Sequence, residues 1–271
     1  PGPEHVLVKM ECSGICGTDI HISQGAIPIN LPEIIIGHEA LGVISGLGAE
    51  NLCDATGEPL KEGDRVILVV ADTCGTCSYC REGDFASCQK MGVTYFQTPE
   101  EPPHLHGGFA QYIYHPASCT VKVPQMVPLQ AAAAYPCAGP TVLQAIEYAG
   151  GLEAGEKVLI QGSGPVGLFA VLYAKKRGAQ VCFFGSSSNP KRLEIASLYG
   201  ADKVGDIKKT DQAEREEIIR EWTSGLGVDA AIEASGNPKA FAEVLSLLRT
   251  RGRYLVPGQY SNRGPTPIST E

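Results

Sequence analysis

The sequence predicts an α/β protein in which a small β-rich domain is followed by a doubly wound parallel sheet. Residues 1–138 contain short alternating apolar runs separated by Gly and Pro, a pattern typical of strands in a barrel or folded sheet. Residues 139–271 alternate between strand-like and helix-like segments at the spacing of βαβ units. A glycine-rich turn between the first strand and the helix that follows it supports the same class. We therefore expect two domains that meet between residues 138 and 139.

The expected strands follow from the apolar patterns. In the first domain they cover residues 6–10, 42–45, 64–70, 110–114 and 120–123. In the second domain they cover residues 157–161, 180–184, 202–204, 228–233 and 253–256. A dinucleotide-binding sheet of this kind normally has six strands, and the sequence supplies five. Because the first alternating run also starts almost at once, we expect a chain that is truncated at both ends.

Helices are expected between the strands of the second domain, where proline marks starts and glycine marks ends. Proline suits a first helical turn, and glycine suits the left-handed residue that follows a helix. These signals predict helices over residues 165–177, 190–199, 211–223 and 238–251.

Charge and composition exclude several classes of function. The chain of 271 residues has 22 Lys and Arg against 30 Asp and Glu, a net charge of −8, and no basic cluster. Nucleic acid and anionic membranes are therefore unsuitable partners. The apolar stretches at residues 33–47 and 131–138 are too short or too interrupted to span a bilayer. The first residues lack a secretion signal, so we expect a cytoplasmic protein whose ten cysteines stay reduced and free to bind metal.

The turn after the expected strand at residues 157–161 has the sequence G-S-G-P-V-G. Gly162 suits a tight turn, Gly164 lets the backbone approach a pyrophosphate, and Gly167 lets helix and strand pack closely. Pro165 and Val166 begin the helix, whose N-terminus favours a phosphate. The motif and its strand-to-helix context predict a dinucleotide-binding site.

The choice between NAD and NADP depends on the end of the next strand. About 20 residues beyond Gly167, an NAD-preferring fold carries an acidic residue that binds the ribose hydroxyls. This chain has Ser187 and Ser188 there, followed by Lys191 and Arg192, and no carboxylate to repel a 2′-phosphate. The pattern favours NADP slightly. The alternative, in which the serines contact the ribose of NAD, remains open.

A cluster of cysteines predicts a structural metal site. Cys74, Cys77, Cys80 and Cys88 lie within one loop-like segment, as in a closed tetrahedral zinc site. An iron–sulfur cluster is the competing interpretation. It is disfavoured because seven residues precede the last cysteine and Gln89, rather than Pro, follows it.

A second candidate metal set is dispersed along the chain and consists of Cys16, His38 and Cys137. Each residue alone is unremarkable, because single cysteines and histidines are common structural residues. Together they form a three-ligand zinc shell with an open fourth position, which is the catalytic arrangement. Three further histidines are candidates for pocket residues, but we expect each to be a solvated loop residue: His104, His106 and His115.

Several motifs in one order carry a family resemblance. Besides the cysteine loop and the glycine turn, they are C-G-x-D-x-H at residues 16–21, G-H-E at 37–39, G-D-R-V at 63–66, G-G-F-A-Q-Y at 107–112 and V-D-A-A-I-E-A-S-G at 228–236. The chain resembles the zinc-dependent medium-chain dehydrogenase/reductase superfamily, in particular its alcohol, polyol and threonine dehydrogenases. The resemblance implies a GroES-like zinc-binding catalytic domain joined to a Rossmann dinucleotide-binding domain.

The resemblance also implies roles for residues near the dispersed set, which would bind the catalytic zinc. Glu39 would stand behind or transiently approach the metal, and Asp19 would orient a ligand. Thr18 would take the proton of the alcohol and pass it through the cofactor ribose toward His21.

The function implied is hydride transfer between an alcohol or polyol and NAD or NADP, with one catalytic and one structural zinc in a homodimer or homotetramer. One alternative is the NADPH-dependent enone or quinone reductase branch, which normally lacks the cysteine loop and the catalytic ligands. The other is a zinc-stabilised dinucleotide-binding protein without dehydrogenase activity, because a fold does not guarantee a reaction.

Overall fold

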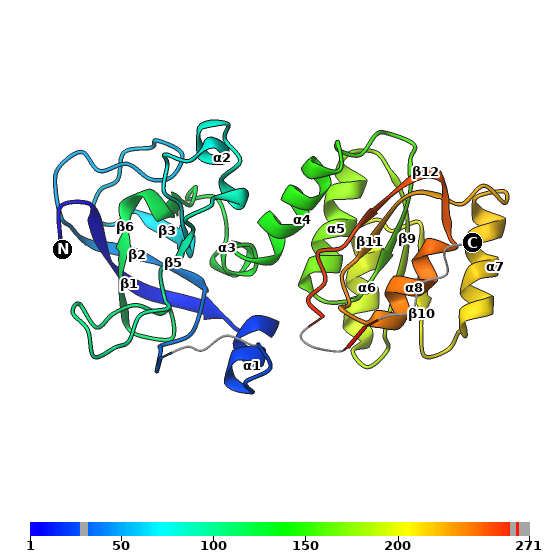
Figure 1. Ribbon diagram of the computed structural model, residues 1–271, viewed down its shortest axis with the longest axis horizontal. Helices are drawn as coiled ribbons and strands as arrows, with labels where there is room; N and C mark the ends of the chain where they lie inside the picture. Colours follow the sequence, from blue (N-terminus) through cyan, green and yellow to red (C-terminus); the bar gives the residue numbers. More distant parts are fainter. Residues whose placement is uncertain (28–31, 261–263, 266–271) are drawn as a thin grey trace. The chain divides into compact units, whose positions relative to one another are not determined.

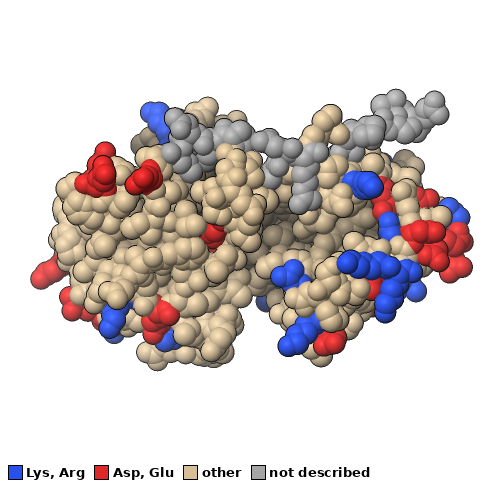
Figure 2. All heavy atoms as spheres, turned by 90° about the horizontal axis from the view of Figure 1, so that it is seen from below, with Lys and Arg blue, Asp and Glu red and all other residues tan. Residues whose placement is uncertain are grey.

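The computed structural model describes residues 1–27, 32–260 and 264–265. The chain divides into two compact units, Pro1–Cys137 and Ala138–Glu271, whose elements are labelled in Figure 1. Figure 2 shows acidic and basic side chains together on one face of the second unit, in line with the mixed charge pattern of the sequence. Within the described part of the chain, no helix is long and apolar enough to cross a membrane.

The first unit is built on an antiparallel five-stranded sheet in the order β6-β1-β2-β3-β7 (Figure 1). Its strands are β1 His5–Gly14, β2 Glu39–Leu47, β3 Arg65–Leu68, β6 Tyr112–Pro116 and β7 Thr120–Lys122. The alternation in β1 buries Val6 and Val8, which pack with Ile44 and Val66 in one apolar cluster. Burial of these side chains is the main force that holds the sheet together.

Smaller elements surround this sheet. Two short strands, β4 Ala71–Asp72 and β5 Gly92–Val93, pair antiparallel and close the base of the cysteine-rich loop. The helices of this unit are α1 Gly17–Ser23, α2 Ser78–Arg81 and α3 Leu129–Ala134, with single 3₁₀ turns η1 Phe85–Ser87 and η2 Ala117–Cys119.

The second unit contains a parallel five-stranded sheet in the order β10-β9-β8-β11-β12 (Figure 1). Its strands are β8 Lys157–Gln161, β9 Gln180–Gly185, β10 Lys203–Asp206, β11 Val228–Glu233 and β12 Leu248–Leu255. Its helices are α4 Ala138–Tyr148, α5 Pro165–Lys176, α6 Pro190–Leu198, α7 Gln212–Trp222 and α8 Pro238–Leu245. The strand order reverses between β8 and β11, and this switch point is where doubly wound sheets bind ligands. The predicted fold class is confirmed.

Helices cover both faces of this sheet. Strand residues such as Val158 and Phe183 pack with α4, α5 and α6, whereas Leu159 and Phe184 pack with α7 and α8. Strands buried on both faces have nearly continuous apolar sequences, which explains why β8 and β9 lack the polar alternation of β1.

The helix predicted over residues 238–251 is wrong at its end. Helix α8 stops at Leu245, and β12 begins at Leu248. The pairing between β11 and β12 is irregular. Val228 pairs with Leu248 and Ala230 pairs with Arg253, so the residues of β12 between these two pairs form a bulge. Arg251 in this bulge has a φ of 64°. Gly252 belongs to this bulge rather than to a helix cap.

The prediction of solvated loop histidines is also wrong for two of the three residues. His115 lies in β6 and is fully buried, with Nε2 at 3.0 Å from the carbonyl oxygen of Val69 and 3.1 Å from that of Cys119. Burial lowers its pKa to about 4, so it is neutral at pH 7. His106 is also buried, and His104 is exposed.

Candidate functional site

Four residues with metal-ligating side chains gather in the first unit: Cys16, His38, Glu39 and Cys137. One ligand atom from each lies within 4.8 Å of the others. Cys16 is the N-cap of α1, directly after β1, and Glu39 is the first residue of β2. The pairing of Gly14 with Glu39 between β1 and β2 brings these two segments together. The dispersed set predicted from the sequence is therefore assembled at one place.

The geometry of this cluster suits a zinc ion. The Sγ atoms of Cys16 and Cys137 are 3.8 Å apart, far beyond a disulfide bond. Two sulfurs that each lie about 2.3 Å from a tetrahedral zinc are separated by about 3.8 Å. Thiolates, an imidazole and a carboxylate are also the ligand types that zinc prefers.

Asp19 connects the cluster to its supporting backbone. Its carboxylate is buried, and Oδ2 accepts a hydrogen bond of 2.8 Å from the backbone N–H of Cys16. Oδ1 accepts one of 3.3 Å from the N–H of Gly37 and lies 3.2 Å from Nδ1 of His38. A carboxylate beside Nδ1 orients the imidazole and leaves Nε2 for a metal.

The electrostatics of the cluster stabilise negative charge on sulfur. A hydrogen bond from Cys137 lowers the pKa of Cys16 to about 3, and the same hydrogen bond raises the pKa of Cys137. Burial, assisted by the charge on Cys16, raises the pKa of Glu39 to about 7. Burial opposes protonation of His38, but its hydrogen bond with Cys16 and the charge of Asp19 outweigh this effect and raise its pKa. Two thiols that share one negative charge release a proton when a metal binds both.

Other side chains border this cluster. The Oγ1 atom of Thr18 lies 3.8 Å from Sγ of Cys16. His21 is three residues further along α1 and is not one of the clustered ligands. The buried ring of Tyr95 stacks on His38 with ring centroids 5.7 Å apart. The sequence alone does not predict this stacking, because the contact joins distant segments and has no motif of its own.

The four-cysteine loop forms a second cluster, in which the sulfurs of Cys74, Cys77, Cys80 and Cys88 all lie within 4.8 Å of one another. The Sγ atoms of Cys74 and Cys88 are 3.6 Å apart, again close to the edge of a zinc tetrahedron. Hydrogen bonds from the backbone of Thr76 and Cys77 lower the pKa of Cys74 to about 6. Four sulfur donors fill a tetrahedral shell, so this geometry suits a closed structural site.

The glycine turn of the second unit has the predicted form. Gly162 has a φ of 115°, and a Cβ there would lie 2.7 Å from the backbone of Ala234. A Cβ on Gly167 would lie 1.8 Å from the carbonyl oxygen of Gly162. At Gly164 a Cβ would meet only open space, and α5 begins directly afterwards at Pro165, followed by Val166. The turn therefore presents open backbone and a helix N-terminus to a ligand.

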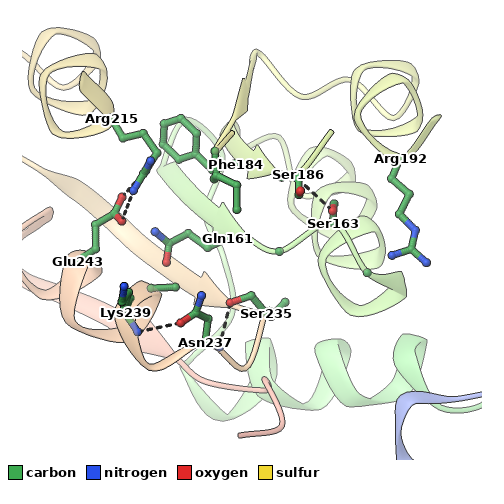
Figure 3. A pocket seen from close by; sticks show the side chains of 16 residues that line it. Gln161, Ser163, Phe184, Ser186, Arg192, Arg215, Ser235, Asn237, Lys239 and Glu243 are labelled. Atoms are coloured by element: carbon green, nitrogen blue, oxygen red, sulfur yellow. Dashed lines mark hydrogen bonds and ion pairs between the residues drawn. The ribbon is translucent and has the colours of Figure 1, made fainter. Parts of the chain in front are cut away.

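A pocket of about 470 Å³ lies beside this turn, at the carboxyl ends of β8, β9 and β11 (Figure 3). Arg192 lines it, whereas Ser187, Ser188 and Lys191 are not among the lining residues that the structure describes. Ser186 also lines it, and its backbone N–H donates a hydrogen bond of 3.3 Å to Oγ of Ser163 in the glycine turn.

The expectation that no carboxylate lies near Ser187 needs correction. None follows β9, but β10 supplies Asp206, whose Oδ1 accepts hydrogen bonds from the backbone N–H groups of Ser187 and Lys208 at 3.0 and 3.1 Å. Although desolvation opposes ionisation, these hydrogen bonds lower the pKa of Asp206, which is therefore charged at pH 7. The prediction considered only the residues that follow β9. The carboxylate comes instead from the end of the neighbouring strand, β10.

The second unit has the parallel sheet and glycine turn of dinucleotide-binding proteins. The first unit has two clusters of cysteine-rich ligands whose geometry suits zinc. Together these features indicate a metal-binding dehydrogenase. Residues 2–125 match the family described as "Alcohol dehydrogenase GroES-like domain", and residues 165–270 match "Zinc-binding dehydrogenase". The chain belongs to this zinc-binding family of medium-chain dehydrogenases/reductases, as the motifs predicted.

Individual relatives are similar over nearly the whole chain. The 5-exo-hydroxycamphor dehydrogenase of Pseudomonas putida is 33% identical over 270 residues, which cover 99% of this chain and 73% of that protein. A solved alcohol dehydrogenase from Thermotoga maritima has a TM-score of 0.90 at 34% identity, with 99% of this chain and 74% of that chain covered. A zinc-binding dehydrogenase from Sinorhizobium meliloti 1021, solved with NADP bound, has a TM-score of 0.80 at 25% identity, with 99% and 73% covered.

Proposed function

We propose that this protein is a zinc-dependent dehydrogenase that transfers a hydride between a small alcohol or polyol and a nicotinamide dinucleotide. The observation that carries the proposal is the cluster of Cys16, His38 and Cys137, which combines zinc geometry with too few sulfur and nitrogen ligands to fill the shell. The glycine turn and its pocket supply a site for the dinucleotide. Membership of the zinc-binding dehydrogenase family supports both parts.

The residues around the cluster have distinct tasks in this proposal. A zinc ion held by these residues would supply the Lewis acidity that favours loss of the alcohol proton. Asp19 holds the imidazole of His38 in one orientation. Thr18 places a hydroxyl beside Cys16, where it would accept the alcohol proton while its own proton passes through the cofactor ribose toward His21, one turn along the same helix. Glu39 lies beside the other ligands and would be a reserve ligand for a bound metal.

The proposal predicts oxidation of at least one small alcohol. Purified, zinc-loaded protein is mixed with a panel of alcohols, polyols and hydroxy acids and with NADP or NAD, and the absorbance of the reduced nicotinamide is followed. Reduction of cofactor by one substrate class supports the proposal. Zinc-loaded protein that binds the dinucleotide and oxidises nothing in the panel would instead favour a binding protein.

Assembly into a homodimer or homotetramer remains a prediction, which sedimentation tests.

We expect two zinc ions per chain. The two clusters share no residue, so Cys80→Ser and His38→Ala should each lower the zinc content of the protein to one ion per chain. Elemental analysis by mass spectrometry measures these contents directly. Iron accompanied by visible absorbance would contradict the zinc assignment of the four-cysteine loop.

For the cofactor, we propose a modest preference for NADP over NAD. Arg192 lines the pocket next to the serine-rich loop, and a charge-assisted hydrogen bond to a 2′-phosphate contributes about 1.5–3 kcal/mol, or roughly tenfold or more in affinity. Asp206 opposes this preference, because its carboxylate lies at 3.0 Å from the backbone nitrogen of Ser187. The net preference is therefore smaller than Arg192 alone would give.

Two substitutions test this balance through the ratio of kcat/KM for NADP to that for NAD. Ser187→Asp adds a second carboxylate and should reverse the preference in favour of NAD. Asp206→Asn keeps an oxygen that accepts the two backbone hydrogen bonds but removes the charge, and it should raise the ratio about three- to tenfold. A wild-type protein that prefers NAD would contradict the proposal.

A further inference from the structure

The pocket beside the glycine turn has more apolar than polar surface. Its lining includes the side chains of Phe184, Ile207 and Ala240, of which Phe184 is labelled in Figure 3. Such walls suit the faces of a flat aromatic ring. A polar group at the edge of such a ring adds specificity for one kind of ring, and the pocket contains a polar group of this kind.

That group is the carboxamide of Gln161, the last residue of β8. The side chain is 5% exposed, and within the described residues its Oε1 has no hydrogen-bond partner. Figure 3 shows the amide pointing into the pocket, toward the side where Lys239 and Glu243 lie. Strand β8 is held between β9 and β11, so the position of Gln161 is fixed. Buried polar groups normally have partners, and one without a partner in a pocket is available to a ligand.

Three other polar side chains of the pocket, those of Arg215, Glu243 and Asn237, already have partners. Arg215 and Glu243 form a buried two-pronged ion pair, with both N–O distances 2.8 Å. Oδ1 of Asn237 accepts a hydrogen bond of 3.1 Å from the backbone of Lys239. The amide oxygen of Gln161 differs from these groups because it is buried and has no partner among the described residues, so it can bind a ligand.

The position of the pocket limits what that molecule is. In a doubly wound sheet the pyrophosphate of a dinucleotide lies at the glycine turn and the adenosine ribose lies at the end of the next strand. Gln161 immediately precedes Gly162, and the pocket continues past Ser186 to Ile207. The base attached to that ribose is thus the part of the dinucleotide that reaches the pocket beside Gln161.

A carboxamide is complementary to the edge of adenine. Its oxygen accepts from the 6-amino group while its amide nitrogen donates to a neighbouring ring nitrogen. We propose that Gln161 recognises the adenine base of the dinucleotide and makes the site selective for the 6-amino group. This inference rests on the dinucleotide binding of the proposed function but not on its zinc chemistry.

The test compares ADP with purine riboside 5′-diphosphate, which carries hydrogen in place of the 6-amino group. Their dissociation constants are measured by titration calorimetry on the purified full chain, so no turnover is needed. Wild-type protein should bind ADP about tenfold more tightly, because the analogue leaves the buried amide oxygen unpaired. In Gln161→Leu, and independently in Gln161→Met, the two affinities should become equal within about twofold.

Arg192→Met serves as the matched control. Arg192 lines the same pocket but lies beyond the glycine turn from Gln161 (Figure 3), so its loss should change the affinity for both nucleotides by the same factor and leave their ratio unchanged. Wild-type protein that binds the two nucleotides equally, or a Gln161→Leu protein that still prefers ADP, would overturn the inference. Failure to bind either nucleotide would overturn the dinucleotide site as well. Selective ADP binding without alcohol oxidation would support the inference and contradict only the proposed reaction.

Discussion

His38→Ala is expected to lower kcat/KM for alcohol oxidation by about a thousandfold or more, which corresponds to roughly 4 kcal/mol of lost transition-state stabilisation. The imidazole is the one nitrogen ligand of the cluster, and without it two cysteines and Glu39 cannot hold the same open zinc geometry. Dinucleotide affinity should stay within about twofold of wild type, because the glycine turn and its pocket belong to the other compact unit. Steady-state kinetics and calorimetric titration with the cofactor measure the two quantities.

The control for this experiment is His104→Asn. His104 is exposed and has a φ of 65°, a left-handed conformation that asparagine tolerates well. This substitution should leave turnover, zinc content and cofactor affinity unchanged. If His38→Ala kept wild-type turnover, zinc at this cluster would not be part of the reaction, whereas a loss in His104→Asn as well would point to general instability.

The features that were predictable from sequence are those whose physical cause is local. Gly167 is identifiable because a Cβ there would collide with the carbonyl oxygen of Gly162 in the same strand–turn–helix unit, and Gly162 is identifiable because the tight turn gives it a positive φ. The four cysteines of the loop are identifiable for the same reason, since one short segment supplies the whole ligand shell. The dispersed set was found from residue types and motif order, and its assembly depends on the pairing of β1 with β2.

The features that were missed depend on contacts between distant segments. Tyr95 reaches His38 from a loop with no periodic pattern, and Asp206 reaches Ser187 from the neighbouring strand. The end of α8 was misplaced because Leu247 and Leu248 continue an apolar pattern that suits either a helix or a buried strand. Sheet pairing decided between these two, and a single sequence does not show pairing.

The four-cysteine loop gives the second large expected effect, this time on stability. Between residues 73 and 91, the only buried residues that the structure describes are Cys80 and Cys88. The loop contains only α2 and one 3₁₀ turn, and neither is long enough to be stable alone. Its order therefore depends on the sulfur cluster and the metal that the cluster binds.

Cys80→Ser should remove one zinc per chain, lower the Tm of the protein by about 10 °C and increase protease cleavage between β4 and β5. Calorimetry and limited proteolysis measure the last two effects. Cys53→Ser is the matched control, because Cys53 is exposed and outside both clusters, so its Tm should change by less than about 1 °C. A Cys80→Ser protein that retained two zinc ions and the wild-type Tm would show that the loop is ordered by its backbone alone. Because the loop and the Cys16 cluster share no ligand, the zinc that remains in Cys80→Ser should still be lost on the further substitution His38→Ala.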